Sequence, residues 1–180
     1  MEESFDYREN LDENLDQEID KVLRPKYLAD FSGQPAIVEN LEVFIQAAKL
    51  RKEPLDHVLL HGPPGLGKTT LAHIISQQLK RPFYALSAIN SGVKDIREVI
   101  EKAKSQAFFG AANPILFIDE IHRFSKSQQD SLLGAVEKGV VTLVGATTEN
   151  PSFEVISALL SRCQVYILKN LSEEELIALL

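Results

Sequence analysis

Eight consecutive residues constrain this chain more than any others. They read G-x-x-x-x-G-K-T, with an apolar run at 56–61 before them and a helically spaced run at 70–75 after them. A strand, a glycine-rich turn and a helix in this order bind phosphate, because the glycines let backbone N–H groups turn toward phosphate oxygens. The motif predicts a nucleoside triphosphate site formed by Gly62, Pro63, Pro64, Gly65, Leu66, Gly67, Lys68 and Thr69.

The side chains at the end of this motif and two later carboxylates have predicted roles in catalysis. Lys68 can reach the β and γ phosphates, and the Thr69 hydroxyl can bind Mg²⁺. Asp119 and Glu120 follow the apolar run 115–118, at the end of a predicted buried strand. We expect Asp119 to hold Mg²⁺, directly or through water, and Glu120 to polarise the attacking water. A helix-capping Asp beside a solvated Glu is the alternative.

A third group of polar residues follows the predicted strand 140–146. In a sheet of this type, that strand lies between the strands that carry the phosphate loop and Asp119, so its end faces the γ-phosphate. Asn150 or Thr148 would orient the water from there, with Asn150 the first choice, although Asn150-Pro151 also predicts a turn. Arg162 can stabilise transition-state charge on a neighbouring subunit's nucleotide, although a surface ion pair is the commoner role.

Continuous apolar strands alternate with helices along the chain. This order is typical of an α/β fold with a parallel sheet covered on both faces. The helix at 35–51 has an apolar stripe of Ile37, Leu41, Phe44, Ile45 and Ala48. The other expected elements are strands at 57–61, 82–86, 114–118, 140–146 and 164–168, and helices across the run 70–75, at 93–107, at 126–138 and from Ser172.

Composition narrows the class of protein. No apolar run approaches the roughly 20 residues of a membrane span, so no membrane partner is expected. The single cysteine, Cys163, excludes an internal disulfide and fits a cytoplasmic location. Nine acidic and one basic residue fall within 1–20, so that segment carries a charge of −8, and the rest of the chain sums to +1 of the net −7. We expect an acidic arm at 1–20, a nucleotide-binding core at 21–170 and, at 171–180, the start of a truncated helical domain.

The motifs together resemble the AAA+ ATPases of the clamp-loader clade, and two families within it. From about residue 87 onward, the chain resembles the replication-associated recombination protein RarA, also called MgsA. From about residue 5 to 75, it resembles RuvB, the Holliday-junction branch-migration motor. The strings that resemble RarA are 91–98, 119–124, 126–130 and 145–154, and those that resemble RuvB are 23–28, 31–34, 40–51 and 56–71.

The resemblance implies a three-layer αβα domain with a five-stranded parallel sheet, ATP and Mg²⁺ as cofactors, and a helical lid that is missing or only begun. It implies that Leu23, Arg24 and the stretch 27–33 contact adenine. Gly65, Lys68, Thr69 and Thr70 would hold the phosphates. In the same way Asn150 corresponds to sensor 1 and Arg162 to the arginine finger that acts in trans within a homo-oligomer.

The chain thus reads as two related proteins joined within about 76–86, and a natural chimera, a designed hybrid and an assembly artefact remain open. RuvB carries a β-hairpin that contacts RuvA, whereas only a short segment separates Glu120 from Val141 here. Docking to RuvA in that manner is therefore not expected. The resemblance to RarA implies forked, gapped or junction DNA as a partner, together with single-stranded-DNA-binding protein or replisome components.

Three functions follow as hypotheses. The first is a DNA-stimulated ATPase of RarA type, acting at stalled forks, gaps or recombination intermediates. The second is a RuvB-type branch-migration motor, and the third is a nucleotide-gated binding module without appreciable turnover. Basic residues at 94–104 can meet DNA phosphates, although a solvated helix face is the commoner reading. Phe108 and Phe109 are expected in the core or at a packing lip rather than in a base-stacking platform.

Overall fold

The computed structural model of the protein describes residues 18, 19 and 22–180. The predicted acidic arm at 1–20 lies almost entirely outside these residues. Among the described helices, none is long and apolar enough to cross a membrane.

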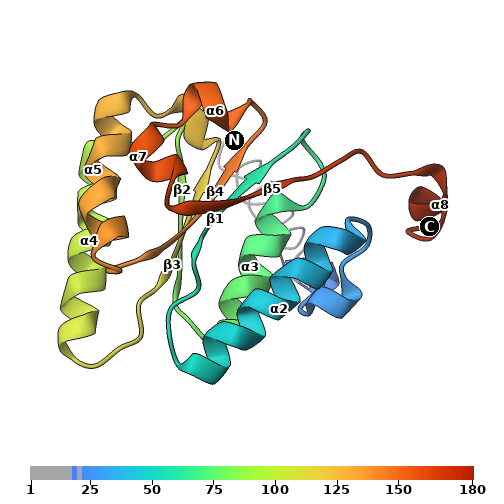
Figure 1. Ribbon diagram of the computed structural model, residues 1–180, viewed down its shortest axis with the longest axis horizontal. Helices are drawn as coiled ribbons and strands as arrows, with labels where there is room; N and C mark the ends of the chain where they lie inside the picture. Colours follow the sequence, from blue (N-terminus) through green and yellow to red (C-terminus); the bar gives the residue numbers. More distant parts are fainter. Residues whose placement is uncertain (1–17, 20–21) are drawn as a thin grey trace, which may run out of the picture.

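Five parallel strands form one sheet at the centre of the fold (Figure 1). Their spatial order is β2-β3-β4-β1-β5, and every neighbouring pair runs in the same direction. This confirms the predicted five-stranded parallel sheet and the position of β4 between β1 and β3. The bounds are β1 His57–His61, β2 Phe83–Ser87, β3 Ile115–Asp119, β4 Thr142–Thr147 and β5 Cys163–Ile167.

Helices cover both faces of the sheet and make a three-layer αβα domain. On one face lie α2 and α3, and on the other lie α4 and α5, with α7 beside α5 (Figure 1). Since right-handed crossovers carry the chain between parallel strands, each strand–helix unit adds a helix to one face. The helices are α2 Pro35–Arg51, α3 Lys68–Leu79, α4 Val93–Phe108, α5 Lys126–Glu137, α6 Pro151–Glu154, α7 Ser157–Leu160 and α8 Glu173–Ile177, with short 3₁₀ turns η1 Leu28–Asp30 and η2 Ile121–Arg123.

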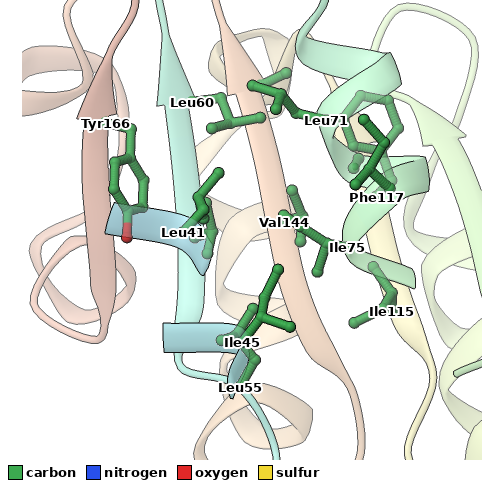
Figure 2. Close-up of a cluster of buried hydrophobic side chains, with 14 of the residues drawn as sticks. Leu41, Ile45, Leu55, Leu60, Leu71, Ile75, Ile115, Phe117, Val144 and Tyr166 are labelled. Carbon is green, nitrogen blue, oxygen red and sulfur yellow. The ribbon is translucent and has the colours of Figure 1, made fainter. Parts of the chain in front are cut away.

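Alternation along the strands divides the core into two apolar layers. In β1, Val58 and Leu60 face α2 and α3, whereas Leu59 faces the α4–α5 layer. Figure 2 shows the first layer, where Leu41 and Ile45 of α2 approach side chains from the central strands. Because both faces of β3 and β4 are buried, these strands read as continuous apolar runs in the sequence.

The expected strands and the helices with predicted bounds agree with the structure within one or two residues, and the helical run 70–75 lies within α3. The helix at 35–51 and the strand at 57–61 have the predicted bounds. Within the predicted stripe, Leu41, Ile45 and Ala48 are buried, and Ile37 and Phe44 pack against them half-buried. Ser172 caps α8 through its hydroxyl and Glu175, which confirms the predicted helix start.

The expected core position of Phe108 and Phe109 is wrong. Their side chains are 86% and 83% exposed, and the two rings meet edge to face at the end of α4. The helix ends at Phe108, and Gly110 follows with φ +82°, so both rings lie at the turn that leads from α4 toward β3. Apolar character alone could not reveal this direction.

Candidate nucleotide-binding and catalytic site

The predicted site residues gather where the strands end. Gly62 follows β1, Asp119 ends β3, and Thr147 ends β4, which lies between the other two. His61 pairs with Thr147, and Ile118 pairs with Gly145, so the three strand ends stand at one edge of the sheet. Ligands of open α/β sheets bind at this carboxyl edge, because loops diverge there and leave a crevice.

The phosphate loop uses its glycines in two ways. Gly65 and Gly67 have φ of +82° and +84°, a region that glycine adopts without steric cost. A Cβ on Gly67 would lie 2.9 Å from the Phe31 ring, and one on Gly62 would lie 2.8 Å from the Leu168 carbonyl oxygen. A side chain at either position would therefore clash with a neighbouring residue. The loop leads into the start of α3, where N–H groups and the helix dipole favour an anion.

Lys68 extends along the inside of this loop. Its ammonium group donates to the carbonyl oxygens of Gly62 at 2.6 Å and Pro63 at 2.7 Å, and the residue is only 8% exposed. Burial lowers the pKa of Lys68, and the nearby charges of Glu120 and then Asp119 work in the opposite direction. The ammonium group is therefore held at the phosphate loop, where it can bind phosphate oxygens.

Glu120 has an unusual backbone conformation. It follows β3 with φ +54° and ψ +44°, the left-handed region that residues other than glycine rarely occupy. Its Oε2 lies 3.3 Å from His122 Nε2 and accepts a hydrogen bond from Thr148 Oγ1 at 3.4 Å. The side chain is 21% exposed, so the carboxylate remains accessible to water while its direction is restrained.

Asp119 and Thr69 provide oxygen ligands of the kind that Mg²⁺ prefers. Asp119 is the last residue of β3, and Thr69 lies in the first turn of α3. Among the described residues no cluster of three or more His, Cys, Asp or Glu could hold a metal by itself. Mg²⁺ in nucleotide sites is held by one or two protein oxygens together with phosphates and water, and this donor set fits that pattern.

The two candidate water-orienting residues occupy different environments. Thr148 approaches Glu120, as described above. Asn150 is exposed, and its Oδ1 accepts from Ser152 N at 3.0 Å as the N-cap of α6. Thr148 thus contacts the proposed catalytic carboxylate directly and Asn150 caps α6, and the role of Asn150 as the first choice for orienting the water stays a prediction.

Arg162 lies at the other edge of the sheet. It precedes β5, whose first residue, Cys163, pairs with His57 at the start of β1. A strand rises about 3.3 Å per residue, so β1 separates Arg162 from its own phosphate loop by more than about 10 Å. Its guanidinium group donates to Ala158 O and to Glu137 Oε1, both at 2.6 Å.

Only some of the residues predicted to contact adenine lie close to the phosphate loop and α3. Arg24 and Thr70 line one hollow of about 330 Å³ with Pro25, Lys26, His73 and Gln77. Leu23 is 75% exposed and does not line this hollow. From the stretch 27–33, Phe31 packs against Gly67 of the phosphate loop.

Three of the four basic residues of α4 have local partners. Lys94 pairs with Glu98 at 3.8 Å, Lys104 pairs with Glu101 at 3.2 Å, and Lys102 Nζ lies 5.0 Å from the centroid of the Tyr84 ring. These contacts fit a solvated helix face.

Two contact residues had no predicted role. His122 joins Glu120 to Thr147, whose Oγ1 lies 2.9 Å from His122 Nδ1. The sequence offered one signal for a role of His122, namely its position two residues after the predicted catalytic carboxylate Glu120. Its direction depends on the left-handed turn at Glu120, which the residue types do not reveal.

The comparisons with known proteins agree with this geometry. The family description "Holliday junction DNA helicase RuvB P-loop domain" matches residues 23–162. The chain is 46% identical over 167 residues to the replication-associated recombination protein A of Escherichia coli K12, covering 91% of this chain and 36% of that protein. It is 50% identical over 159 residues to the ATPase WRNIP1 of Dictyostelium discoideum, covering 88% of this chain and 18% of that protein.

A solved structure of the Thermotoga maritima RuvB Holliday junction branch migration motor is also similar. Its sequence identity is 40% and its TM-score 0.74, over 86% of this chain and 51% of that chain. The chain spans less than half the length of the curated relatives described here. The match to the Escherichia coli protein includes residues 76–86, so this similarity continues across the position where the sequence suggested a join. The chain belongs to the RuvB P-loop domain family, and it is an AAA+ domain with relatives of both RarA and RuvB type.

Proposed function

We propose that this chain binds ATP with Mg²⁺ and hydrolyses it as the core of a RarA-type protein of DNA replication, recombination and repair. Stalled forks, gaps or recombination intermediates are the proposed sites of action, and DNA is proposed to stimulate turnover. The support is the site geometry together with similarity to relatives named for replication-associated recombination.

The proposed chemistry divides among residues at the sheet edge. Lys68 and the loop N–H groups, with Thr70 beside them, hold the phosphates, and Asp119 and Thr69 hold Mg²⁺. When bound, Mg²⁺ would neutralise charge that develops on the transferred phosphoryl group. Glu120 polarises the attacking water and accepts its proton, and the Thr148 hydroxyl restrains the carboxylate.

The observation that carries this proposal is the placement of Glu120. Its carboxylate follows β3 at the carboxyl edge of the sheet and contacts Thr148 Oγ1 at 3.4 Å and His122 Nε2 at 3.3 Å. Burial lowers the pKa of Lys68, and the charge of Glu120 partly opposes this effect. A protein that only binds nucleotide has no need of a restrained carboxylate at this position. Hydrolysis therefore explains the arrangement better than binding alone.

Assembly is part of the proposal. Because Arg162 lies at the edge opposite its own phosphate loop, it can act only on a nucleotide bound by another subunit. We therefore propose a homo-oligomer with Arg162 as an arginine finger in trans. We further propose a cytoplasmic location, a core at 21–170, a helical lid beginning at 171–180, and contacts with single-stranded-DNA-binding protein or replisome components.

A RuvB-type branch-migration motor is the second candidate, favoured by the similarity to the Thermotoga maritima structure. The segment between Glu120 and Val141, which the structure describes completely, contains η2 and α5 but no strand. It therefore lacks the hairpin that RuvB would use to contact RuvA, and we do not propose RuvA as a partner.

The experiment is to measure binding and hydrolysis of Mg-ATP by this chain, with and without forked or gapped DNA. Lys68→Ala should lose nucleotide binding, because it removes the ammonium group held at the loop. Lys80→Ala is the matched control, since Lys80 is an exposed lysine that follows the same helix. Binding without any turnover in the parent chain would support the nucleotide-gated module instead, and unchanged binding in Lys68→Ala would refute the site.

A further inference from the structure

A path of polar contacts connects Glu120 to the phosphate loop through His122. His122 lies in η2 with its side chain only 10% exposed. Its Nε2 is 3.3 Å from Glu120 Oε2, and its Nδ1 is 2.9 Å from Thr147 Oγ1. The imidazole thus contacts the proposed catalytic carboxylate with one nitrogen and the end of β4 with the other.

Thr147 extends this path to the phosphate loop. The residue is fully buried at the end of β4, and its carbonyl oxygen accepts from Gly62 N at 3.1 Å. Its hydroxyl also accepts from Glu149 N at 3.1 Å and can donate to Glu149 O at 3.2 Å. Thr147 is therefore fixed by backbone contacts on two sides, and one of these is the first residue of the loop.

The chemistry of the three groups limits the arrangements of protons, because the Thr147 hydroxyl can donate either to His122 Nδ1 or to Glu149 O. A carboxylate accepts hydrogen bonds only, so the nitrogen that faces Glu120 must carry a proton. In a neutral imidazole, Nδ1 is then an acceptor, and the Thr147 hydroxyl can donate to it. Each group in the path from Gly62 to Glu120 thus has a partner of the matching kind.

We propose that His122 is a positioning residue that aims the Glu120 carboxylate at the attacking water and ties its direction to the phosphate loop through Thr147. The inference rests on the proposed function, because it concerns the residue assigned as the water-activating base. Glu120 has a left-handed backbone that does not by itself fix the side chain, so its direction depends on contacts such as those with His122 and Thr148.

The first test compares substitutions of His122 in steady-state ATP hydrolysis. His122→Ala should lower kcat about 10-fold to 100-fold, the scale expected when a reacting group is misdirected by about 1 Å. KM should change little, because His122 does not contact the phosphate loop directly. His122→Gln places an amide N–H near the position of Nε2 and should recover much of kcat, whereas the shorter Asn side chain should not.

The second test probes the other end of the path. Thr147→Val keeps the shape but removes the hydroxyl, and it should lower kcat in the same direction as His122→Ala. Thr147→Ser restores the hydroxyl and should restore turnover. In the double variant His122→Ala/Thr147→Val, the two effects should not add, because both act through one contact.

Glu120→Gln is measured together with the His122 and Thr147 variants, and the folding of each variant is checked by circular dichroism. Three results then distinguish a failure of the proposed function from a failure of this inference alone. Turnover that persists in Glu120→Gln, or a parent chain without turnover, would overturn the proposed function and this inference with it. Loss of turnover in Glu120→Gln with unchanged kcat in His122→Ala would overturn the inference alone. A third result would be that His122→Ala loses stability, that its effect on kcat adds to that of Thr147→Val, and that His122→Gln recovers nothing. This result would assign His122 a purely structural role and would also overturn the inference.

Discussion

Thr148 Oγ1 donates a hydrogen bond to Glu120 Oε2 across 3.4 Å. The contact joins the loop after β4 to the residue after β3, although 27 intervening residues, including the whole of α5, separate the two in the chain. It places a polar group from the loop that follows the central strand beside the carboxylate proposed to activate water.

This contact predicts different effects for the two candidate water-orienting residues. Thr148→Val should reduce ATP turnover with little change in the free energy of unfolding, because it removes a hydroxyl from a partly exposed site. Asn150→Ala removes the N-cap of α6 and should cost about 1 kcal/mol of stability while turnover continues. Turnover rates and urea midpoints of both variants decide this. If turnover were lost in Asn150→Ala but kept in Thr148→Val, Asn150 rather than Thr148 would be the water-orienting residue, as the sequence suggested.

The position of Arg162 predicts complementation between two inactive variants. Lys68→Ala lacks a functional phosphate loop, and Arg162→Ala lacks the proposed arginine finger. In an equal mixture, about a quarter of the interfaces should join an intact loop to an intact arginine, so turnover should reappear. The measurement is hydrolysis by each variant alone and by the mixture, at a fixed total protein concentration. A mixture no more active than its components would contradict action in trans.

The αL backbone at the end of α3 predicts a stabilising substitution. Lys80 caps this helix with φ +52°, a conformation that costs a residue with a Cβ about 1 kcal/mol. Lys80→Gly should therefore raise the free energy of unfolding by up to about 1 kcal/mol. Lys138 is the matched control, because it caps α5 with φ −83°, where glycine should be neutral or destabilising. Chemical denaturation of both variants checks this, and a stabilising Lys138→Gly would contradict it.

His57 predicts a pH dependence of stability. Its Nδ1 accepts from Leu143 N at 3.0 Å and its Nε2 lies 3.0 Å from Val136 O, so the neutral ring bridges β4 and α5. Burial lowers its pKa below the ordinary 6.5, and the Val136 hydrogen bond opposes this. The unfolded chain therefore binds the proton first as the pH falls.

The stabilisation from His57 is accordingly complete above about pH 6.5 and is lost as the pH falls below this value. Denaturation midpoints at pH 7.5 and 5.5 should show a decrease that is smaller in His57→Gln, because glutamine does not titrate. An equal decrease in the variant would assign the pH dependence to other groups.

The sequence was informative where local chemistry and periodicity agree. The helix Pro35–Arg51 follows from an apolar stripe at helical spacing, and the phosphate loop follows from glycines whose backbone freedom the turn requires. Asp119 and Glu120 could be placed because a buried strand must end at the carboxyl edge of a parallel sheet.

Side-chain direction was harder to predict, because it depends on turns and on partners far along the chain. The contact between His122 and Thr147 requires the left-handed turn at Glu120 and the register of β4. The exposure of Phe108 depends on where α4 ends, which hydrophobicity does not indicate. Asn150 was preferred for its residue type, whereas its side chain is engaged in capping α6.

The most direct test of the account is single-turnover hydrolysis of Mg-ATP by the parent chain and by Glu120→Gln, with nucleotide binding measured on the same samples. Glutamine keeps the size of the side chain and its contact with Thr148 but cannot accept the proton from water. The account predicts equal nucleotide binding and a loss of hydrolysis by at least about 100-fold, within the range that a positioned general base contributes. Hydrolysis at the parent rate in Glu120→Gln would contradict the central claim that this carboxylate activates the water.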